Sequence, residues 1–164
     1  MLPVLWVACA AVIVAAAFRV GSHDDARTIG RFGVGALYVG AGAAVNLGML
    51  LRGDDYAGFA DGAYVAFVRN TWESLVVPNH HWFIGALIVF ELAVGLLALS
   101  GGKRTQVAYA AAIAFHVALL SFGWGFYLWS IPMIAALVTL LRAERSPADA
   151  PAAGAIRIGG PKTA

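Results

Sequence analysis

The stretch WFIGALIVFELAVGLLALSGGKRTQVAYAAAIAFHVALLSF, residues 82–122, decides the fold. It contains two apolar runs, residues 82–99 and 107–122, joined by a short polar turn with Lys103 and Arg104. Each run approaches the roughly 20 apolar residues that a helix needs to cross a bilayer. The pair therefore predicts two antiparallel membrane-spanning helices.

The composition of the 164-residue chain extends this prediction to the whole protein. It is 61% hydrophobic and only 12% charged, with a mean hydropathy of +0.79. Soluble domains average about 45–50% apolar and about 25% charged. A domain of about 150 residues leaves roughly 30% of its unfolded-chain surface exposed, so a soluble core cannot bury this excess. A soluble globular protein is therefore excluded, and the net charge of +2 gives no basis for nucleic-acid binding.

Five apolar runs predict an all-α, polytopic membrane helix bundle over residues 1–142. The spans are expected at about residues 2–18, 32–51, 82–99, 107–122 and 126–141, with an outer loop at 52–81 and a flexible cytoplasmic tail at 143–164. Glycine interrupts helices, so Gly123-Trp124-Gly125 is expected to separate the last two spans. The first run is expected to be a retained helix. A signal peptide is the alternative, but the run lacks a basic leader and a clear cleavage site.

The basic residues predict the orientation of these spans. Nine fall on one side of the expected membrane, and only Arg52 and Arg69 fall on the other. The nine are Arg19, Arg27, Arg31, Lys103, Arg104, Arg142, Arg145, Arg157 and Lys162. Because cytoplasmic loops are enriched in Lys and Arg, we expect the N-terminus outside and the C-terminus inside.

The outer loop has an aromatic pattern of its own. Asp54 and Asp55 are suitable caps for a helix start, and aromatic and alanine residues then recur at helical spacing from Tyr56 to Phe67. This pattern predicts a helix lying in the membrane interface with its aromatic face down. A lid packed on the bundle is the alternative. Pro78 is expected to break any helix before the third span.

Two ionisable residues, Glu91 and His116, fall in the middle of predicted spans. Each lies ten residues from the turn that joins the two helices, so both are expected at the same depth, about 15 Å from that turn. A lone carboxylate at the bilayer centre is costly, so we expect Glu91 to have a polar partner. The pair predicts an interhelical hydrogen bond, a proton relay, or a polar contact to a quinone-like head group.

Other candidate ligands carry weaker patterns. Haem b is not expected, because it needs two opposed axial ligands and only His116 lies deep in a span. The neighbouring His80 and His81 are weak candidates for a metal, and no metal site is predicted. A single cysteine, Cys9, excludes an internal disulfide.

Two further patterns predict contact surfaces. Ala36, Gly40, Ala44 and Gly48 repeat every four residues and predict a helix-packing stripe, within the chain or against another subunit. The five tryptophans all fall in the outer half of the expected bundle, at Trp6, Trp72, Trp82, Trp124 and Trp129. They predict an interfacial belt, or an outer surface that packs against another protein or a lipid-like ligand.

Three short segments resemble the DoxX-like family of small bacterial integral membrane proteins. They are RFGVGAL at residues 31–37, FELAVGLLAL at residues 90–99 and the turn GGKR at residues 101–104. The resemblance covers the core Arg31–Arg142 and implies a four-helix bundle with a glutamate, here Glu91, in its second helix. Two departures are the additional N-terminal span and Asn46, which lies near where the family often has a lysine.

The resemblance also implies a bacterial plasma membrane location and a link to membrane redox complexes. Some relatives are small subunits of thiosulfate:quinone oxidoreductases, others associate with oxidative-stress or sulfur-handling partners, and many have no assigned activity. The chain shows no nucleotide-binding loop and no flavin or iron–sulfur motif, so an independent enzyme is not expected.

The first functional hypothesis is therefore an accessory subunit of a membrane redox or respiratory complex, in contact with lipid and with other integral membrane subunits. The alternatives are a quinone-site subunit using Glu91 and His116, and a small proton-coupled transporter or lipid-binding protein. No covalent cofactor is expected, and a quinone is the one cofactor that the pattern suggests.

Overall fold

The computed structural model describes residues 2–23 and 25–146. All regular structure within these residues is helical. The elements are α1 (Leu2–Arg19), α2 (Ala26–Gly35), η1 (Ala36–Ala44), α3 (Val45–Leu51), α4 (Ala66–Thr71), η2 (Trp72–Val76), η3 (Val77–Asn79), α5 (His80–Leu99), α6 (Gly102–Leu119), η4 (Leu120–Phe122) and α7 (Trp124–Arg145). Both η1 and η2 are π-helical, whereas η3 and η4 are single 3₁₀ turns.

Four continuous helical segments are long and apolar enough to cross a membrane. They are Ala26–Leu51, Ala66–Leu99, Gly102–Phe122 and Trp124–Arg145. These four segments confirm the prediction of an all-helical protein with several helices long and apolar enough to cross a membrane. Helix α1 is apolar but shorter, so the predicted fifth span and the predicted orientation remain predictions.

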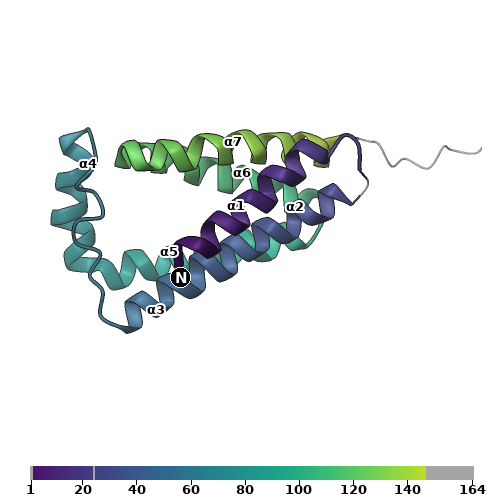
Figure 1. Ribbon diagram of the computed structural model, residues 1–164. Coiled ribbons are helices and arrows are strands. Elements are labelled where there is room, and N and C mark those ends of the chain that lie inside the picture. The colour runs from purple at the N-terminus through teal and green to yellow at the C-terminus, as the bar shows by residue number, and fades with distance from the viewer. Residues whose placement is uncertain (1, 24, 147–164) are drawn as a thin grey trace, which may run out of the picture.

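The helices form a closed bundle in which neighbours along the chain pack together. The segment formed by α2 and η1 contacts α5, α5 contacts α6, α6 contacts α7, and α1 contacts both α2 and α7. Figure 1 shows α1 running alongside α2 and η1 toward the far end of α7, while α4 lies across one end of the bundle. Helix α1 buries Cys9, Ile13 and Ala16 in the same core as Val34 and Leu137.

Glycines mark the two sharp connections between the last three helices. Gly101 has a φ of 79° and precedes α6, and Gly123 has a φ of 108° and precedes α7. L-residues with a Cβ rarely adopt these angles, so glycine is required there. The predicted break at Gly123 is confirmed, and α7 extends to Arg145, four residues beyond the predicted end of the span at residue 141.

The outer loop differs from its prediction. Residues 57–62 form turns rather than a helix, and the helix begins only at Ala66. Tyr56 and Gly58 both have positive φ, and the Asp55 carboxylate accepts a 2.9 Å bond from the Ala57 amide instead of capping a helix. This local turn competes with the helix that the spacing predicted. Pro78 does not end the helical run either, because it occupies a 3₁₀ turn between η2 and α5.

The predicted small-residue stripe does not supply close packing within the chain. Ala36 and Ala44 are exposed, and a Cβ built on Gly40 would meet nothing within 4 Å. Ala36, Gly40 and Ala44 lie in the π-helical η1, on a side that the rest of the chain leaves uncovered. The close approach is made instead by Gly35 and Gly95, where an added Cβ would overlap Leu99 and Val39.

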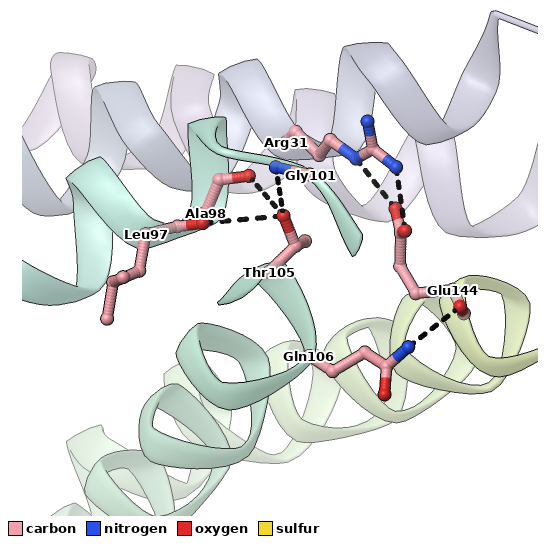
Figure 2. A network of polar contacts seen from close by, with 7 residues as sticks. All are labelled: Arg31, Leu97, Ala98, Gly101, Thr105, Gln106 and Glu144. Carbon is pink, nitrogen blue, oxygen red and sulfur yellow. Dashed lines mark hydrogen bonds and ion pairs between the residues drawn. The ribbon is translucent and has the colours of Figure 1, made fainter. Parts of the chain in front are cut away.

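A saturated polar network holds one end of the bundle together (Figure 2). The Arg31 guanidinium of α2 donates two hydrogen bonds, of 2.8 and 2.7 Å, to the Glu144 carboxylate of α7. Gln106 of α6 donates to the Glu144 backbone carbonyl at 3.0 Å. The Thr105 hydroxyl accepts from the Gly101 amide and donates to the Ala98 carbonyl, both at 2.9 Å. This Glu144 network joins α2, α6 and α7 around the turn after α5.

The predicted tail, residues 143–164, is only partly covered. Residues 143–145 belong to α7 rather than to a tail. The part from residue 147 onward lies outside the described residues.

Candidate functional site

A cavity of about 420 Å³ lies at the end of the bundle opposite the Glu144 network. Its size falls within the range of roughly 300–1,000 Å³ that small-molecule sites occupy. Ten of its twenty lining residues are aromatic. These are Trp6, Tyr38, Tyr56, Phe59, Trp72, Phe83, Phe115, Phe122, Phe126 and Trp129. The wall is thus suited to an apolar, flat ligand.

Glu91 of α5 lies on this wall and is 5% exposed. Its Oε2 accepts a 2.9 Å hydrogen bond from Nδ2 of Asn46, which lies on α3. No other described residue donates to the carboxylate. Space for the carboxyl group is provided by Gly42 of η1, since a Cβ there would lie 2.6 Å from Oε1. One carboxylate oxygen is therefore held by the protein, and Oε1 is left without a donor.

His116 of α6 also lines the cavity and is 2% exposed. Its Nδ1 lies 2.9 Å from the Ala112 carbonyl oxygen and 3.3 Å from the Tyr38 hydroxyl. A carbonyl oxygen only accepts, so Nδ1 carries a hydrogen, and Nε2 of the neutral ring is an acceptor. Nε2 is buried and has no hydrogen-bond partner within residues 2–23 and 25–146.

The structure brings Glu91 and His116 to one cavity, as their matching depth suggests. No hydrogen bond or ion pair joins them among the described residues. The interhelical polar pair is formed by Glu91 and Asn46 instead. The partner was not identified from the sequence, because Asn46 lies on a span distant along the chain. The available indication was that Asn46 is a polar residue inside an apolar run.

The segment from Tyr56 to Trp72 forms a lid over the cavity. The Tyr56 hydroxyl donates to the Asn46 carbonyl at 3.1 Å and lies 3.3 Å from Asn46 Oδ1. Trp72 Nε1 in turn donates to the Tyr56 carbonyl at 2.9 Å. Burial, reinforced by the nearby Asp54 and Glu91, raises the pKa of the Tyr56 hydroxyl, so it stays a protonated donor. A hydrogen-bonded chain thus leads from the lid through Asn46 to Glu91.

Aromatic contacts hold the lid to the start of α7. Phe59 stacks on Trp72 with ring centroids 4.9 Å apart, and it meets the rings of Phe122 and Phe126 at 5.2 and 5.3 Å. The backbone of the lid also presses against the turn before α7. A Cβ on Gly123 would overlap the Gly62 carbonyl. The lid alternative for the outer loop therefore describes this arrangement better than a separate interfacial helix.

The five tryptophans divide into two groups. Trp6, Trp72 and Trp129 line the cavity, and Trp6 Nε1 donates to the Ala41 carbonyl. Trp82 and Trp124 are exposed on the outside of the bundle. Three of the five tryptophans thus line the cavity. Their position on one side of the predicted bundle could not show whether they line a cavity or form an interfacial belt.

The weak metal candidates do not assemble into a site within the described residues. The rings of His80 and His81 are tilted by 39° with centroids 4.1 Å apart, and His80 Nδ1 contacts the Val77 carbonyl. No group of three or more His, Cys, Asp or Glu side chains that could hold a metal occurs in this part of the chain. Cys9 is a buried free thiol in the core.

Comparison of the chain with family models, with curated proteins and with solved structures found no match. The resemblance to the DoxX-like family therefore stays a prediction from the three short segments. The functional argument rests on the cavity itself.

Proposed function

We propose that the chain is a membrane subunit that binds a quinone-like molecule in the aromatic cavity. The observation that carries the proposal is the combination of a wall that is half aromatic with Glu91, whose Oε1 lacks a donor among the described residues, and His116 on the same wall. Such sites are typically apolar with a few placed polar groups that orient the ligand. A flat ring with oxygen substituents and an apolar tail has this distribution of surface.

The incomplete hydrogen bonding of Glu91 favours this proposal over a purely structural role. Glu91 lines the cavity and its Oε1 lacks a donor among the described residues, so a donor group on a ligand can supply the missing bond. The lid also supports the proposed ligand site. It covers the cavity, and hydrogen bonds through Asn46 and Tyr56 connect it to the Glu91 carboxylate.

The test is binding of a short-chain benzoquinone or naphthoquinone to the purified protein in lipid nanodiscs, measured by titration calorimetry against empty nanodiscs. Ala118 of α6 lines the cavity, and Ala118→Phe should fill part of it. Ala114 is exposed on the same helix, does not line the cavity, and gives the matched control Ala114→Phe. We expect saturable binding that Ala118→Phe weakens at least about tenfold and Ala114→Phe leaves unchanged. Equal binding in both variants, or no saturable binding, would contradict the proposal.

We also propose that the chain acts beside another integral membrane subunit. The supporting observation is the outward small-residue face of Ala36, Gly40 and Ala44, which leaves open space next to Gly40. Small residues at such a face let helix backbones approach closely in a bilayer.

Gentle detergent extraction followed by mass spectrometry should identify a partner that co-purifies with the wild type and is lost with Gly40→Leu. Gly85→Leu is the matched control, because Gly85 of α5 also has open space around it. A chain that runs alone as a homo-oligomer contradicts the hetero-complex.

A further inference from the structure

We infer, on the basis of the proposed quinone-like ligand, that the cavity takes a long-tailed molecule dissolved in the bilayer, whose tail leaves the cavity sideways between α5 and α6. The α5–α6 seam is formed by Phe83, Leu87 and Phe90 of α5 with Phe115 and Ala118 of α6. Its part toward the Glu144 network is closed, and its part toward the lid is open.

Aromatic rings close the part of the α5–α6 seam that lies toward the Glu144 network. Phe90 and Phe115 pack with ring centroids 5.5 Å apart, and Tyr38 of η1 meets both rings edge-on at 6.5 and 6.2 Å. Glu91 and His116 directly follow these two phenylalanines in the sequence. Among the cavity-lining residues of α5, Glu91 is the farthest from the lid. A head group that contacts Glu91 therefore lies at the inner end of the cavity.

Toward the lid, the α5–α6 seam is lined by residues that reach the surface of the bundle. Phe83 lines the cavity and is 41% exposed, and Ala118 lines it and is also exposed. Counting from the Phe90–Phe115 contact along two antiparallel helices places Leu87 opposite Ala118, which is the smallest side chain of the seam. Figure 1 shows α5 and α6 diverging toward the end of the bundle that α4 crosses. The cavity thus reaches the surface between α5 and α6.

The surface around this opening is suited to lipid. Its exposed residues are Trp82, Ala86 and Val89 of α5 and Ala114 and Val117 of α6. Residues 82–90 and 107–122 contain no Asp, Glu, Lys or Arg. Both helices belong to segments that are long and apolar enough to cross a membrane. In a bilayer, an opening in this face therefore leads to the acyl chains.

Contacts hold the other sides of the cavity. Phe59 and Phe122 both pack on Trp72 where the lid covers the end of the cavity. On the α1 side, Trp6 donates its indole N–H to the Ala41 carbonyl. A ligand that left by either side would have to break these contacts. Among the described residues, no hydrogen bond or ring contact joins the Phe83 side chain to α6.

The distance from Glu91 to the opening indicates a tailed ligand rather than a ring alone. Glu91 and Phe83 are eight residues apart on α5, which is about 12 Å at 1.5 Å per residue. A head group at Glu91 leaves this length for the first part of a tail. A longer tail continues through the opening into the bilayer, where it is surrounded by lipid.

The first experiment compares two quinones with the same ring and with alkyl tails of two and sixteen carbons. Both are bound to the protein in lipid nanodiscs, and each affinity is expressed per mole fraction of quinone in the membrane. We expect the two affinities to agree within about tenfold, because the additional carbons stay in lipid. A larger loss for the long tail would show a closed cavity and overturn the inference, while binding of the short-tailed quinone leaves the proposed function intact. Binding of neither quinone contradicts the proposed function itself.

Photolabelling maps the route of the tail. The sixteen-carbon quinone carries a diazirine about halfway along its tail, and labelled residues are identified by mass spectrometry. We expect labels on residues 82–90 and 114–121 that an excess of the unlabelled quinone removes. Labels on α1 and α7 around Trp6, or on the lid at residues 56–72, would place the exit elsewhere and overturn the inference. Labels that no excess of quinone removes contradict the proposed function.

A variant at the opening tests the same route by affinity. Ala118→Leu places a larger side chain in the opening, and we expect it to lower the ratio of long-tailed to short-tailed affinity about tenfold. Ala114→Leu changes an exposed residue of the same helix that does not line the cavity, and it should leave the ratio at its wild-type value. Partition into the membrane is the same in both variants and cancels from the comparison. An equal ratio in the two variants contradicts an exit past Ala118.

Discussion

Glu144 and Glu91 both have buried side chains, Glu144 near one end of the bundle and Glu91 in the middle of α5, and their surroundings differ in one respect. The Glu144 side chain is 4% exposed, and both of its oxygens accept hydrogen bonds from Arg31. Glu91 is similarly buried, but it receives one hydrogen bond, from the neutral amide of Asn46. Figure 2 shows how neighbouring backbone and side-chain groups complete the Glu144 network.

The difference in hydrogen bonding indicates that Glu91, and not Glu144, is the candidate for contact with a ligand. The Glu144 carboxylate ties α2 to α7 through a bidentate ion pair in which each oxygen has a charged donor, and it lines no described cavity. The Glu91 carboxylate lines a cavity and has one oxygen without a donor. The same residue type is therefore a structural clamp in one place and a candidate ligand contact in the other.

The largest expected effect comes from separating the lid from the bundle. Gly123→Ala places a Cβ against the Gly62 carbonyl and forces an L-residue to a φ of 108°. Backbone strain of about 1–3 kcal/mol, together with about 1–3 kcal/mol of overpacking, should open the lid. Hydrogen exchange of residues 56–72 should rise and ligand affinity should fall at least about tenfold. Gly125→Ala, at a glycine with open space around it, should change neither quantity. An unchanged exchange rate in Gly123→Ala contradicts the docking of the lid at Gly123.

The second-largest effect is expected when the Arg31–Glu144 ion pair is broken and the cavity is left intact. Glu144→Gln replaces a two-point ion pair with a neutral amide, which should lower the free energy of unfolding by about 1.5–3 kcal/mol. Thermal unfolding in detergent measures this loss. Arg145→Gln changes an exposed neighbour on the same helix and should have little effect. Ligand affinity at the far cavity should stay constant in both variants. If Glu144→Gln weakens ligand binding as strongly as it lowers stability, the two ends are not independent.

The third effect is expected when the Glu91 carboxylate is displaced from the cavity wall. A Cβ added by Gly42→Ala would lie 2.6 Å from Glu91 Oε1, so the carboxylate must move away from its position at the wall. Overpacking of this kind costs about 1–3 kcal/mol, and we expect the affinity for a short-chain quinone to fall about tenfold. Gly40→Ala, two residues earlier in η1, meets nothing within 4 Å and serves as the control. Equal affinities in the two variants contradict the role of Gly42.

The smallest effect is a pH dependence of the lid. Burial raises the pKa of Tyr56 above its ordinary value of 10.0. The contribution of Tyr56 to lid closure is therefore fully present below pH 10, and it is lost as the pH rises through the raised pKa. Protease cleavage in residues 56–65 should increase over this range in the wild type. Tyr56→Phe lacks the hydroxyl, so it should show more cleavage at neutral pH and no such rise. An identical pH profile in the two proteins rules out this role of Tyr56.

Much of the fold could be predicted from the sequence, because the governing physics is local. A run of apolar residues must be helical in lipid, where each backbone group needs an internal partner. The break at Gly123 follows from a glycine in an otherwise continuous run. The helix predicted after Asp55 failed because positive φ at Tyr56 and Gly58 gives the chain a local turn that side-chain spacing does not reveal.

The site was predictable only in outline. The depths of Glu91 and His116 follow from counting residues along two helices joined by a short turn. The Asn46 bond and the outward face of the small-residue stripe could not be obtained this way. Both depend on how the segment formed by η1 and α3 packs against α5, which no local pattern specifies.

The sequence by itself determined that this chain is an all-helical membrane protein whose few buried polar residues stand out. Lipid imposes that result, because hydrophobicity and backbone satisfaction act on each segment separately. Which glutamate has a donor on both oxygens, and which has one oxygen without a donor, depends on the packing of the helices. Hydrogen bonding to a buried side chain depends on residues far apart in the chain, such as Arg31 with Glu144 and Asn46 with Glu91. Their meeting is set by how the helices pack rather than by any local pattern.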